Sequence, residues 1–278
     1  MQESLKEDPA SRWQPQPCTP PNRSFKWFTG LGPRLKGKRI LVAGGATGIG
    51  RATALRLAEE GATVVVGDFN EDGAKDTVQQ IQARTQAKAK SIFFDYSNPS
   101  SIKELVHSAV DFLGGLDGLV NVGVLGAKAQ ELDKDISEMD PEAWSWILNG
   151  NLVGYAVAVQ AALPHLMASG NGSSIVNTTS GSIWGAMPFM PAYQAAKAGV
   201  LSLTTYVAQY YAPKGVRSNR ISPGPIPSDA VKTRTPQEWL DGVKETVPLR
   251  RWGEPDEIAA LYVNGQTWSC CGGKYLRD

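Results

Sequence analysis

The chain has 278 residues, of which 42% are hydrophobic and 20% are charged, proportions typical of a folded soluble domain rather than a disordered or collagen-like chain. Its 28 basic and 27 acidic residues leave a formal net charge of +1, which argues against a nucleic-acid partner. The sequence has no uninterrupted run of about 18 apolar residues and no secretory signal pattern. We therefore expect a cytoplasmic protein with no membrane partner.

Cysteine and histidine are both scarce. Cys270 and Cys271 are adjacent, where a disulfide would be strained, and Cys18 makes the count odd, so we expect reduced thiols. The two histidines, His107 and His165, are too few for the common zinc sites, and we expect both to lie on helices. The composition therefore predicts no metal centre.

Residues 1–35 differ from the rest of the chain because prolines interrupt any helix or central strand there. We predict a flexible N-terminal extension. Its aromatic residues, such as Trp13 and Trp27, could alternatively pack on the domain or on a neighbouring subunit. The prolines are Pro9, Pro15, Pro17, Pro20, Pro21 and Pro33.

From residue 36 onward, short apolar runs alternate with segments of helical length. Apolar runs without polar alternation indicate strands buried on both faces, as in a parallel sheet covered by helices. Residues 36–278 are therefore predicted to form one α/β domain, a doubly wound parallel sheet with helices on both faces. The expected helices begin at Gly48 and Glu71, and the expected strands are Arg39–Ala43, Thr63–Gly67, Ser91–Phe94, Leu116–Val120, Ser174–Thr178 and Val216–Ile221.

A glycine-rich turn follows the first predicted strand. Gly44, Gly48 and Gly50 permit tight backbone geometry, and with Thr47 and Ile49 they open a helix whose amino terminus favours an anion. This pattern favours a Rossmann-type fold that binds the pyrophosphate of a dinucleotide. The spacing is Gly-x-x-x-Gly-x-Gly rather than the commoner Gly-x-Gly-x-x-Gly, so a purely structural turn remains the alternative.

Asp68 ends the second predicted strand, 18 residues after Gly50. An acidic residue about 20 positions after such a turn is typical of a ribose-binding carboxylate. Since a carboxylate would repel a 2′-phosphate, Asp68 favours NAD over NADP. Arg51 lies near enough in sequence to keep NADP as an alternative.

Tyr193 and Lys197 lie four residues apart in an alanine-rich segment that we expect to be helical, so both side chains share one face. An ammonium beside a phenol favours the phenolate, which lowers a pKa that starts near 10 toward the range useful for acid/base catalysis. The pair by itself also occurs by chance in many helices.

Further residues give the chain a close resemblance to the short-chain dehydrogenase/reductase family over about residues 36–273. Ser180 follows a predicted strand 13 residues before Tyr193, and Asn151 lies in the long helix before that strand. The segment 219–224, Asn-Arg-Ile-Ser-Pro-Gly, adds a further match after the catalytic helix. The other residues that carry the resemblance are the glycine turn, Asp68, Asp95, Asn121, Tyr193 and Lys197.

The resemblance implies hydride transfer between a nicotinamide and a secondary alcohol or ketone. Tyr193 would move the alcohol proton and Ser180 would hydrogen-bond the substrate oxygen. Lys197 would hold the nicotinamide ribose and lower the pKa of the tyrosine, and Asn151 would anchor a water of the proton path. Family members also associate, so we expect a homo-oligomer formed through the long helices around Asn151 and Tyr193.

The resemblance also implies a set of cofactor contacts along the carboxyl ends of the strands. Beside Tyr193 and Lys197, this set is Gly44, Thr47, Gly48, Ile49, Gly50, Asp68, Asp95, Tyr96, Asn121, Gly123, Pro223, Gly224, Ile226 and Ser228.

The carboxyl end departs from the family pattern. The helix from Pro255 is followed too soon by the last strand, expected at Thr267–Cys271, so that strand is predicted to be displaced or poorly paired. Subunit contacts through this end are therefore doubtful.

The function that the sequence predicts is NAD-dependent oxidation or reduction of a cyclic or otherwise hydrophobic substrate. Trp184, Met187, Phe189 and Met190 are candidates to line an apolar pocket for it. The alternatives are an NADP-dependent ketone reductase of the same family, or a regulatory protein that binds the nucleotide without turnover.

Overall fold

A computed structural model describes residues 33–170, 172–185, 189–227, 236–264 and 268–270. The predicted extension, apart from its last three residues, lies outside the described residues and stays a prediction.

The described residues contain a seven-stranded parallel sheet with the strand order β3-β2-β1-β4-β5-β6-β7. The strands pair in parallel throughout, which confirms the predicted sheet type. Their bounds are β1 Arg39–Ala43, β2 Thr63–Asp68, β3 Ala89–Phe93, β4 Gly118–Asn121, β5 Ser173–Thr178, β6 Val216–Pro223 and β7 Trp268–Cys270.

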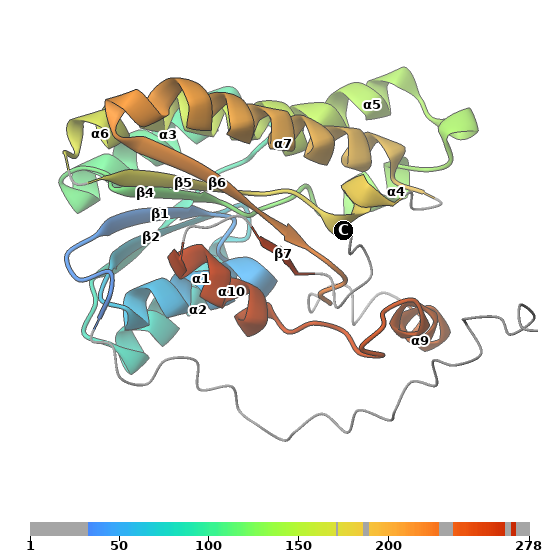
Figure 1. Cartoon of the computed structure of the whole chain (residues 1–278), viewed down its shortest axis with the longest axis horizontal. Helices are drawn as coiled ribbons and strands as arrows, with labels where there is room; N and C mark the ends of the chain where they lie inside the picture. Colours follow the sequence, from blue (N-terminus) through green and yellow to red (C-terminus); the bar gives the residue numbers. More distant parts are fainter. Residues whose placement is uncertain (1–32, 171, 186–188, 228–235, 265–267, 271–278) are drawn as a thin grey trace, which may run out of the picture. The chain divides into compact units, whose positions relative to one another are not determined.

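Helices cover both faces of this sheet. Figure 1 shows α3, α6 and α7 on one face and α1, α2 and α10 on the other. These helices are α1 Gly48–Glu59, α2 Glu71–Arg84, α3 Pro99–Leu113, α6 Gly154–Ala168, α7 Pro191–Tyr211 and α10 Pro255–Asn264. Shorter helices are α4 Ala127–Leu132, η2 Ile136–Glu138, α5 Pro141–Leu148, η4 Gly181–Trp184, η5 Ala212–Lys214 and α9 Gln237–Glu245.

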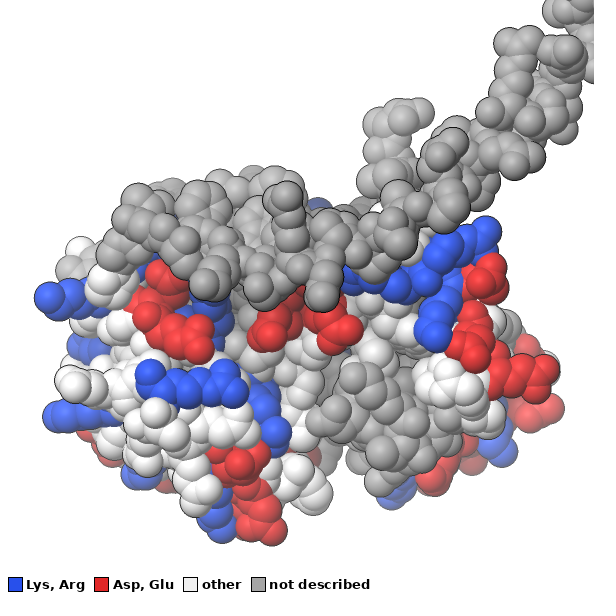
Figure 2. Space-filling model, turned by 90° about the horizontal axis from the view of Figure 1, so that it is seen from below, with Lys and Arg blue, Asp and Glu red and all other residues white. Residues whose placement is uncertain are grey.

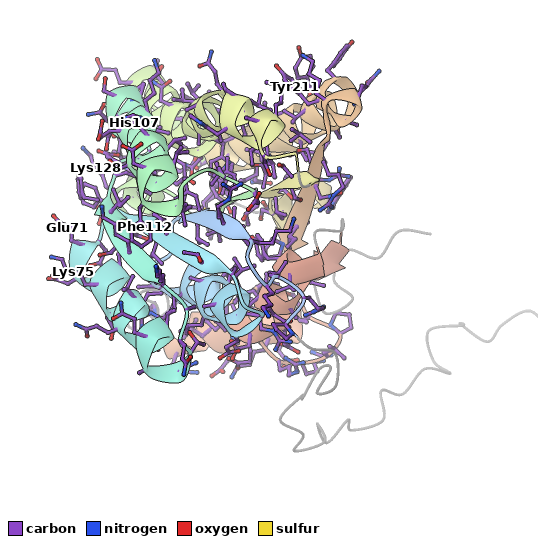
Figure 3. The ribbon with its side chains drawn as sticks, turned by 90° about the vertical axis from the view of Figure 1, so that its left-hand side faces the viewer. Glu71, Lys75, His107, Phe112, Lys128 and Tyr211 are labelled. Carbon is purple, nitrogen blue, oxygen red and sulfur yellow. The ribbon has the colours of Figure 1, made fainter. Side chains whose placement is uncertain are left out.

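The two layers are separate in the edge-on view of Figure 3. Glu71 and Lys75 mark α2 in one layer, while His107 on α3 and Tyr211 on α7 mark the other. Both histidines lie on helices, as expected, because His165 belongs to α6.

The core explains why the central strands lack polar alternation. In β2, Val64, Val65 and Val66 are all fully buried, although neighbouring residues face opposite sides of the sheet. Val65 packs with the α3 and α6 side and the other two with the α1 and α10 side. Burial on both faces therefore confirms the doubly wound fold.

Chain order reverses between β1 and β4, which are neighbours in the sheet. In open α/β sheets, ligands bind in the crevice at such a switch point, outside the carboxyl ends of the strands. Ala43 ends β1 and Asn121 ends β4, and the two residues are partners in the sheet register. The fold therefore predicts a ligand site beside the segments that follow these two strands.

The long helix that contains Asn151 is not a regular α-helix throughout. Between α5 and α6, residues Asn149–Val153 form a π-helical turn, η3.

The combined segment Pro141–Ala168 is long and apolar enough, by length and composition alone, to cross a membrane. Half of its apolar window is buried inside the protein, as happens in core helices that pack on a sheet.

At the carboxyl end, β7 is short but paired. Its residues Trp268 and Cys270 are register partners of Ile221 and Pro223 in β6. The expected displacement is therefore wrong for these three residues. The short helix still reaches this part of the sheet, because α10 packs on α1 and against β6, and Tyr262 of α10 hydrogen-bonds Thr178 of β5.

Charges of both signs are mixed on the surface. In the view of Figure 2, Lys and Arg side chains alternate with Asp and Glu on the described part of the face. Among the described residues visible on that face, no single-sign patch of the kind that binds a polyanion is present.

Candidate active site

The glycine turn after β1 packs tightly against the loop after β4. Gly44 has a φ of +99°, and a Cβ placed there would lie 2.1 Å from the backbone nitrogen of Gly123. A Cβ on Gly50 would lie 1.8 Å from the carbonyl oxygen of Gly44. Only glycine allows these approaches, which bring the amino terminus of α1 to the switch point.

The amino terminus of α1 is available to an anion. Thr47 is the N-cap residue, but its side chain makes no capping hydrogen bond, and the first turn holds no acidic residue. The first N–H groups of a helix have no partner within it and carry the positive end of the helix dipole. Gly48, Ile49 and Gly50 thus form a turn that fits the pyrophosphate of a dinucleotide.

Asp68 lies directly beside this turn. Its Oδ2 accepts a hydrogen bond from the Ala46 backbone nitrogen at 2.9 Å, and its Oδ1 accepts one from Asn70 at 2.9 Å. Burial raises the pKa of Asp68, and the hydrogen bonds from Asn70 and Ala46 oppose that shift. A carboxylate has about four acceptor positions, and the backbone donors Asn70, Ala46 and Phe69 leave one for a further donor, such as a ribose hydroxyl.

Two residues of the expected cofactor set, Asp95 and Tyr96, use their side chains within the protein. The Asp95 Oδ1 accepts hydrogen bonds from the backbone nitrogen and the hydroxyl of Ser97, at 2.7 and 2.8 Å. Tyr96 is buried, and its hydroxyl donates at 3.2 Å toward the Ala43 carbonyl and toward Asn121 Oδ1. Any contact of Tyr96 with a nucleotide would therefore involve its backbone.

Asn121 is also turned inward. Its side chain is fully buried, and its Nδ2 donates to Asn177 Oδ1 at 2.9 Å. Gly123, two residues later, has its backbone nitrogen bonded to the Ala43 carbonyl at 3.0 Å. The loop after β4 therefore borders the crevice through its backbone. The Asn121 side chain instead links β4 to β5.

Tyr193 and Lys197 share one face of α7, as the spacing predicts. The Lys197 Nζ lies 5.7 Å from the centre of the Tyr193 ring. Lys197 is fully buried and donates to the Thr178 carbonyl at 2.9 Å and to the Tyr155 hydroxyl at 3.2 Å.

The expected lowering of the tyrosine pKa does not appear. Burial raises the pKa of Tyr193, although its hydrogen bond with Ser180 acts in the opposite direction. Burial also lowers the pKa of Lys197 to about 7, so the ammonium loses part of its charge near neutral pH. Burial of the pair therefore disfavours the charged form of each residue, the phenolate of Tyr193 and the ammonium of Lys197.

Ser180 stands between β5 and η4 and faces Tyr193. It is the N-cap of η4, and its Oγ accepts hydrogen bonds from the Ser182 hydroxyl at 2.9 Å and the Ser182 nitrogen at 3.2 Å. Because Ser182 fills the acceptor positions, the Ser180 proton is directed elsewhere. The role of Ser182 was missed from sequence, although the Ser-x-Ser spacing after a strand was a visible signal.

Asn151 lies within the π-helical turn η3 and is buried. Its Oδ1 accepts from the Leu125 nitrogen at 3.3 Å, and its Nδ2 donates to the Ile147 carbonyl at 3.1 Å. π-Helical turns are frequent at functional sites. Here the side chain joins the helix to the loop after β4 through these two hydrogen bonds.

A second residue missed from sequence is Asp133. Its carboxylate is buried and accepts from the backbone nitrogens of Ala192 at 3.0 Å and Tyr193 at 2.8 Å. It thereby caps α7, whose own N-cap residue, Met190, makes no side-chain cap. No local pattern could reveal this contact, because the two partners are far apart in the chain.

The last of the expected cofactor residues lie at the end of β6 and in the segment after it. Pro223 ends β6, and Ile226 packs against Gly253, where a Cβ would lie 2.4 Å from the Ile226 Cδ1. Gly224 lies between them and is half-buried. Ser228 lies outside the described residues.

An open hollow of about 400 Å³ lies between η4 and α7, and Trp184 and Gln194 are among the residues that line it. Neither Phe189 nor Met190 belongs to the described lining, and Met187 lies outside the described residues. Of the apolar pocket candidates, Trp184 alone therefore borders this hollow within the described part of the chain.

Comparisons with known proteins agree with this geometry. Residues 44–264 match the family model described as enoyl-(acyl carrier protein) reductase. The chain is 33% identical to the short chain dehydrogenase/reductase astE of Aspergillus oryzae, over 87% of this chain and 96% of that protein. It is 32% identical to 3-oxoacyl-(acyl-carrier-protein) reductase FabG of Thermotoga maritima, over 86% of this chain and 98% of that protein.

A solved structure of similar sequence has the same fold. A short chain dehydrogenase from Burkholderia cenocepacia, crystallised in complex with NADP, superposes with a TM-score of 0.78 at 29% identity, covering 87% of this chain and 100% of that one. The fold and these matches define an oxidoreductase that works with a dinucleotide. More narrowly, the chain belongs to the short-chain dehydrogenase/reductase family, whose members act on hydroxyl or keto groups with NAD(P).

Proposed function

We propose that the protein transfers a hydride between NAD(H) and a secondary alcohol or ketone. The observation that carries this proposal is the convergence of Ser180, Tyr193 and Lys197 from two separate elements. Ser180 follows β5 and is hydrogen-bonded to Tyr193, and Lys197 lies one helical turn further along α7. A hydroxyl donor, a phenol and an amine in this order suit proton transfer at an oxygen.

The chain's residues have distinct roles in this reaction. Tyr193 exchanges the proton of the substrate oxygen, and Ser180, oriented by Ser182, donates a hydrogen bond to the charge that develops there. Lys197 holds the ribose next to the nicotinamide, and Asn151 supports the proton path to solvent. When bound, NAD(P) accepts or supplies the hydride.

The dinucleotide fits the residues at the switch point. The glycine turn, with Gly44, Gly48 and Gly50, would hold the pyrophosphate, and Asp68 would bind the adenosine ribose. Two observations support a preference for NAD. Asp68 faces the turn, and Arg51 is held by Asp76 at 3.0 Å and by the Ala46 carbonyl at 2.9 Å, which restrains it from binding a 2′-phosphate.

The substrate class follows from the surroundings of the serine. Trp184 is 38% exposed beside the open hollow, next to Ile183, so apolar surface is offered close to Ser180. This supports a cyclic or otherwise hydrophobic alcohol or ketone.

We also propose that the protein forms a homo-oligomer in the cytoplasm. Tyr206 and Tyr210 lie one turn apart on α7, pack at 4.6 Å between ring centres and are both more than half exposed. Val153, in η3, is 42% exposed. Exposed apolar groups on these helices support an interface between copies.

A panel of cyclic and aromatic secondary alcohols, each with NAD+ and NADP+, tests the proposal through the absorbance of the reduced nicotinamide. Turnover with NAD+ is the expected result. Faster turnover with NADP+ would instead support the ketone reductase that uses NADP(H), the cofactor bound in the Burkholderia enzyme. Tight nucleotide binding without turnover of any member of the panel would support a regulatory protein.

A further inference from the structure

A second tyrosine contacts Lys197. Tyr155 belongs to α6 and is completely buried, and its hydroxyl accepts a hydrogen bond from the Lys197 Nζ at 3.2 Å. The same hydroxyl donates to the Gly123 carbonyl at 2.9 Å. The Lys197 Nζ also lies 4.4 Å from the centre of the Tyr155 ring, closer than to the ring of Tyr193.

Tyr155 offers the buried ammonium two kinds of support. The hydroxyl is one of two hydrogen-bond acceptors of Lys197 among the described residues, the other being the Thr178 carbonyl at 2.9 Å. The ring face adds a cation–π interaction, which is stronger away from water. Burying an ammonium is costly unless it is paired and hydrogen-bonded, so both contacts favour the charged form of Lys197.

The titratable groups packed around Lys197 are phenols, and the Asp68 carboxylate acts on the outermost of them, Tyr96, by raising its pKa. Tyr193 and Tyr155 lie against the lysine, Tyr96 stacks on Tyr155 at 5.2 Å between ring centres, and Tyr262 reaches Thr178 from α10. Burial raises the pKa of all four, so they are neutral near pH 7. A neutral phenol can accept and donate at once, as Tyr155 does.

Tyr155 also ties the lysine to the cofactor edge of the sheet. Gly123, which accepts from Tyr155, lies against Gly44 of the glycine turn. Tyr96, stacked on Tyr155, hydrogen-bonds the Ala43 carbonyl just before that turn. A displacement of Tyr155 would therefore affect both Lys197 and the backbone at the switch point.

We propose that Tyr155 is a positioning residue for Lys197. The hydroxyl and the ring of Tyr155 hold the Lys197 ammonium between the carboxyl ends of β4 and β5, where the nicotinamide ribose would bind. This inference rests on the proposed function and adds to it a residue outside the Ser180, Tyr193 and Lys197 set. Tyr155 acts through Lys197 and need not touch the substrate.

The test compares Tyr155→Phe, which removes the hydroxyl and keeps the ring, with the wild type and with Tyr211→Phe. Tyr211 is the matched control because it is a half-buried tyrosine on the same helix as Lys197 and belongs neither to the proposed site nor to the proposed interface. Loss of a hydrogen bond to a charged group corresponds to roughly 10- to 100-fold in an equilibrium or a rate. We expect Tyr155→Phe to lower kcat/KM and weaken NADH binding by an amount in this range at neutral pH.

The pH dependence separates positioning from a general loss of structure. Without its acceptor, Lys197 loses its proton at lower pH, so the alkaline limb of NADH binding and of kcat/KM should move down by about one pH unit. In a Lys197→Met background, Tyr155→Phe should weaken NADH binding much less than in the wild type, because only the hydrogen bond to the Gly123 carbonyl is still lost. An unchanged alkaline limb in Tyr155→Phe, or equal effects in both backgrounds, would overturn the proposal.

A stability measurement keeps the proposal testable if the protein turns over none of the substrates. The folded stability should rise with pH once buried Lys197 loses its proton, and Tyr155→Phe should move the start of that rise to lower pH. Unfolding midpoints of both proteins across this pH range do not depend on any activity. A rise that starts at the same pH in both proteins would contradict the Tyr155–Lys197 link, whereas failure of all substrates would contradict the proposed function alone.

Discussion

Asp133 holds Tyr193 by its backbone: the Asp133 Oδ2 accepts a hydrogen bond from the Tyr193 nitrogen at 2.8 Å, across 60 residues of sequence. The other carboxylate oxygen accepts from Ala192 at 3.0 Å, so one buried side chain satisfies two N–H groups at the start of α7. An anion at a helix amino terminus is also favoured by the helix dipole. The position of the proposed acid/base residue therefore depends on a loop that follows α4.

Replacing Asp133 should reduce both stability and activity. Asp133→Ala leaves two helix N–H groups without their acceptor, which should lower the free energy of unfolding by about 1–3 kcal/mol. Because Tyr193 is displaced, kcat should fall more than the affinity for NADH. Denaturant unfolding and steady-state kinetics measure the two effects.

Asp135→Ala is the control for this prediction. Asp135 is exposed and caps only its own short turn, through Ser137 at 2.9 Å. A similar loss of kcat in both variants would show that the loop, rather than the Asp133 carboxylate, is responsible.

Lys197 should make folding stability depend on pH. Burial lowers its pKa to about 7, from an ordinary value of 10.5, so above pH 7 the folded state binds fewer protons than the unfolded state. Stability therefore rises with pH through this window, by up to about 1.4 kcal/mol per pH unit. Lys197→Met removes the effect, and its stability relative to the wild type should fall between about pH 7 and about pH 10.5.

Lys103→Met provides the comparison, because Lys103 is exposed on α3. Its stability relative to the wild type should not change across the same pH range. The same flat dependence for Lys197→Met would mean that Lys197 is charged in the folded protein throughout.

Tyr193→Phe should abolish turnover without loss of the dinucleotide. The substitution removes the hydroxyl that exchanges the proton and keeps the ring that packs beside Lys197. Positioned acid/base groups contribute roughly 10²- to 10⁴-fold to a rate, so kcat should fall by at least that factor. NADH fluorescence titration should give a Kd close to that of the wild type, and wild-type kcat in the variant would refute the assigned role.

The preference between the two nicotinamides should depend on Asp68 and on the Arg51–Asp76 ion pair. Asp68→Ala removes the charge that repels a 2′-phosphate, and Asp76→Asn releases Arg51 from its partner at 3.0 Å. Both should raise the ratio of kcat/KM with NADP to kcat/KM with NAD, and the double variant should raise it most.

Asp72→Asn serves as the control, because this residue lies on the same helix as Asp76 and its side chain is 98% exposed. It should leave the cofactor ratio unchanged. A wild-type protein that already prefers NADP would contradict the ribose argument for Asp68.

Much of the framework followed from local patterns. The apolar runs predicted β1 with its observed bounds, and the glycine spacing located the start of α1 at Gly48. The four-residue spacing of Tyr193 and Lys197 placed them on one helix face, because a helix brings such positions together whatever surrounds it. Periodicity and turn chemistry act over a few residues, so the sequence alone determined these features.

The tertiary structure determined the electrostatics of the site and the long-range hydrogen bonds that position its residues. The pKa of Lys197 depends on its burial under β5 and α6, and the spacing that suggested a more acidic Tyr193 contains no information on desolvation. Asp133 and Tyr155 became visible only when the fold brought distant segments within hydrogen-bond distance. Burial and long-range contacts are properties of the packed chain, and for that reason the charge state of the proposed catalytic pair could not be predicted before the fold was known.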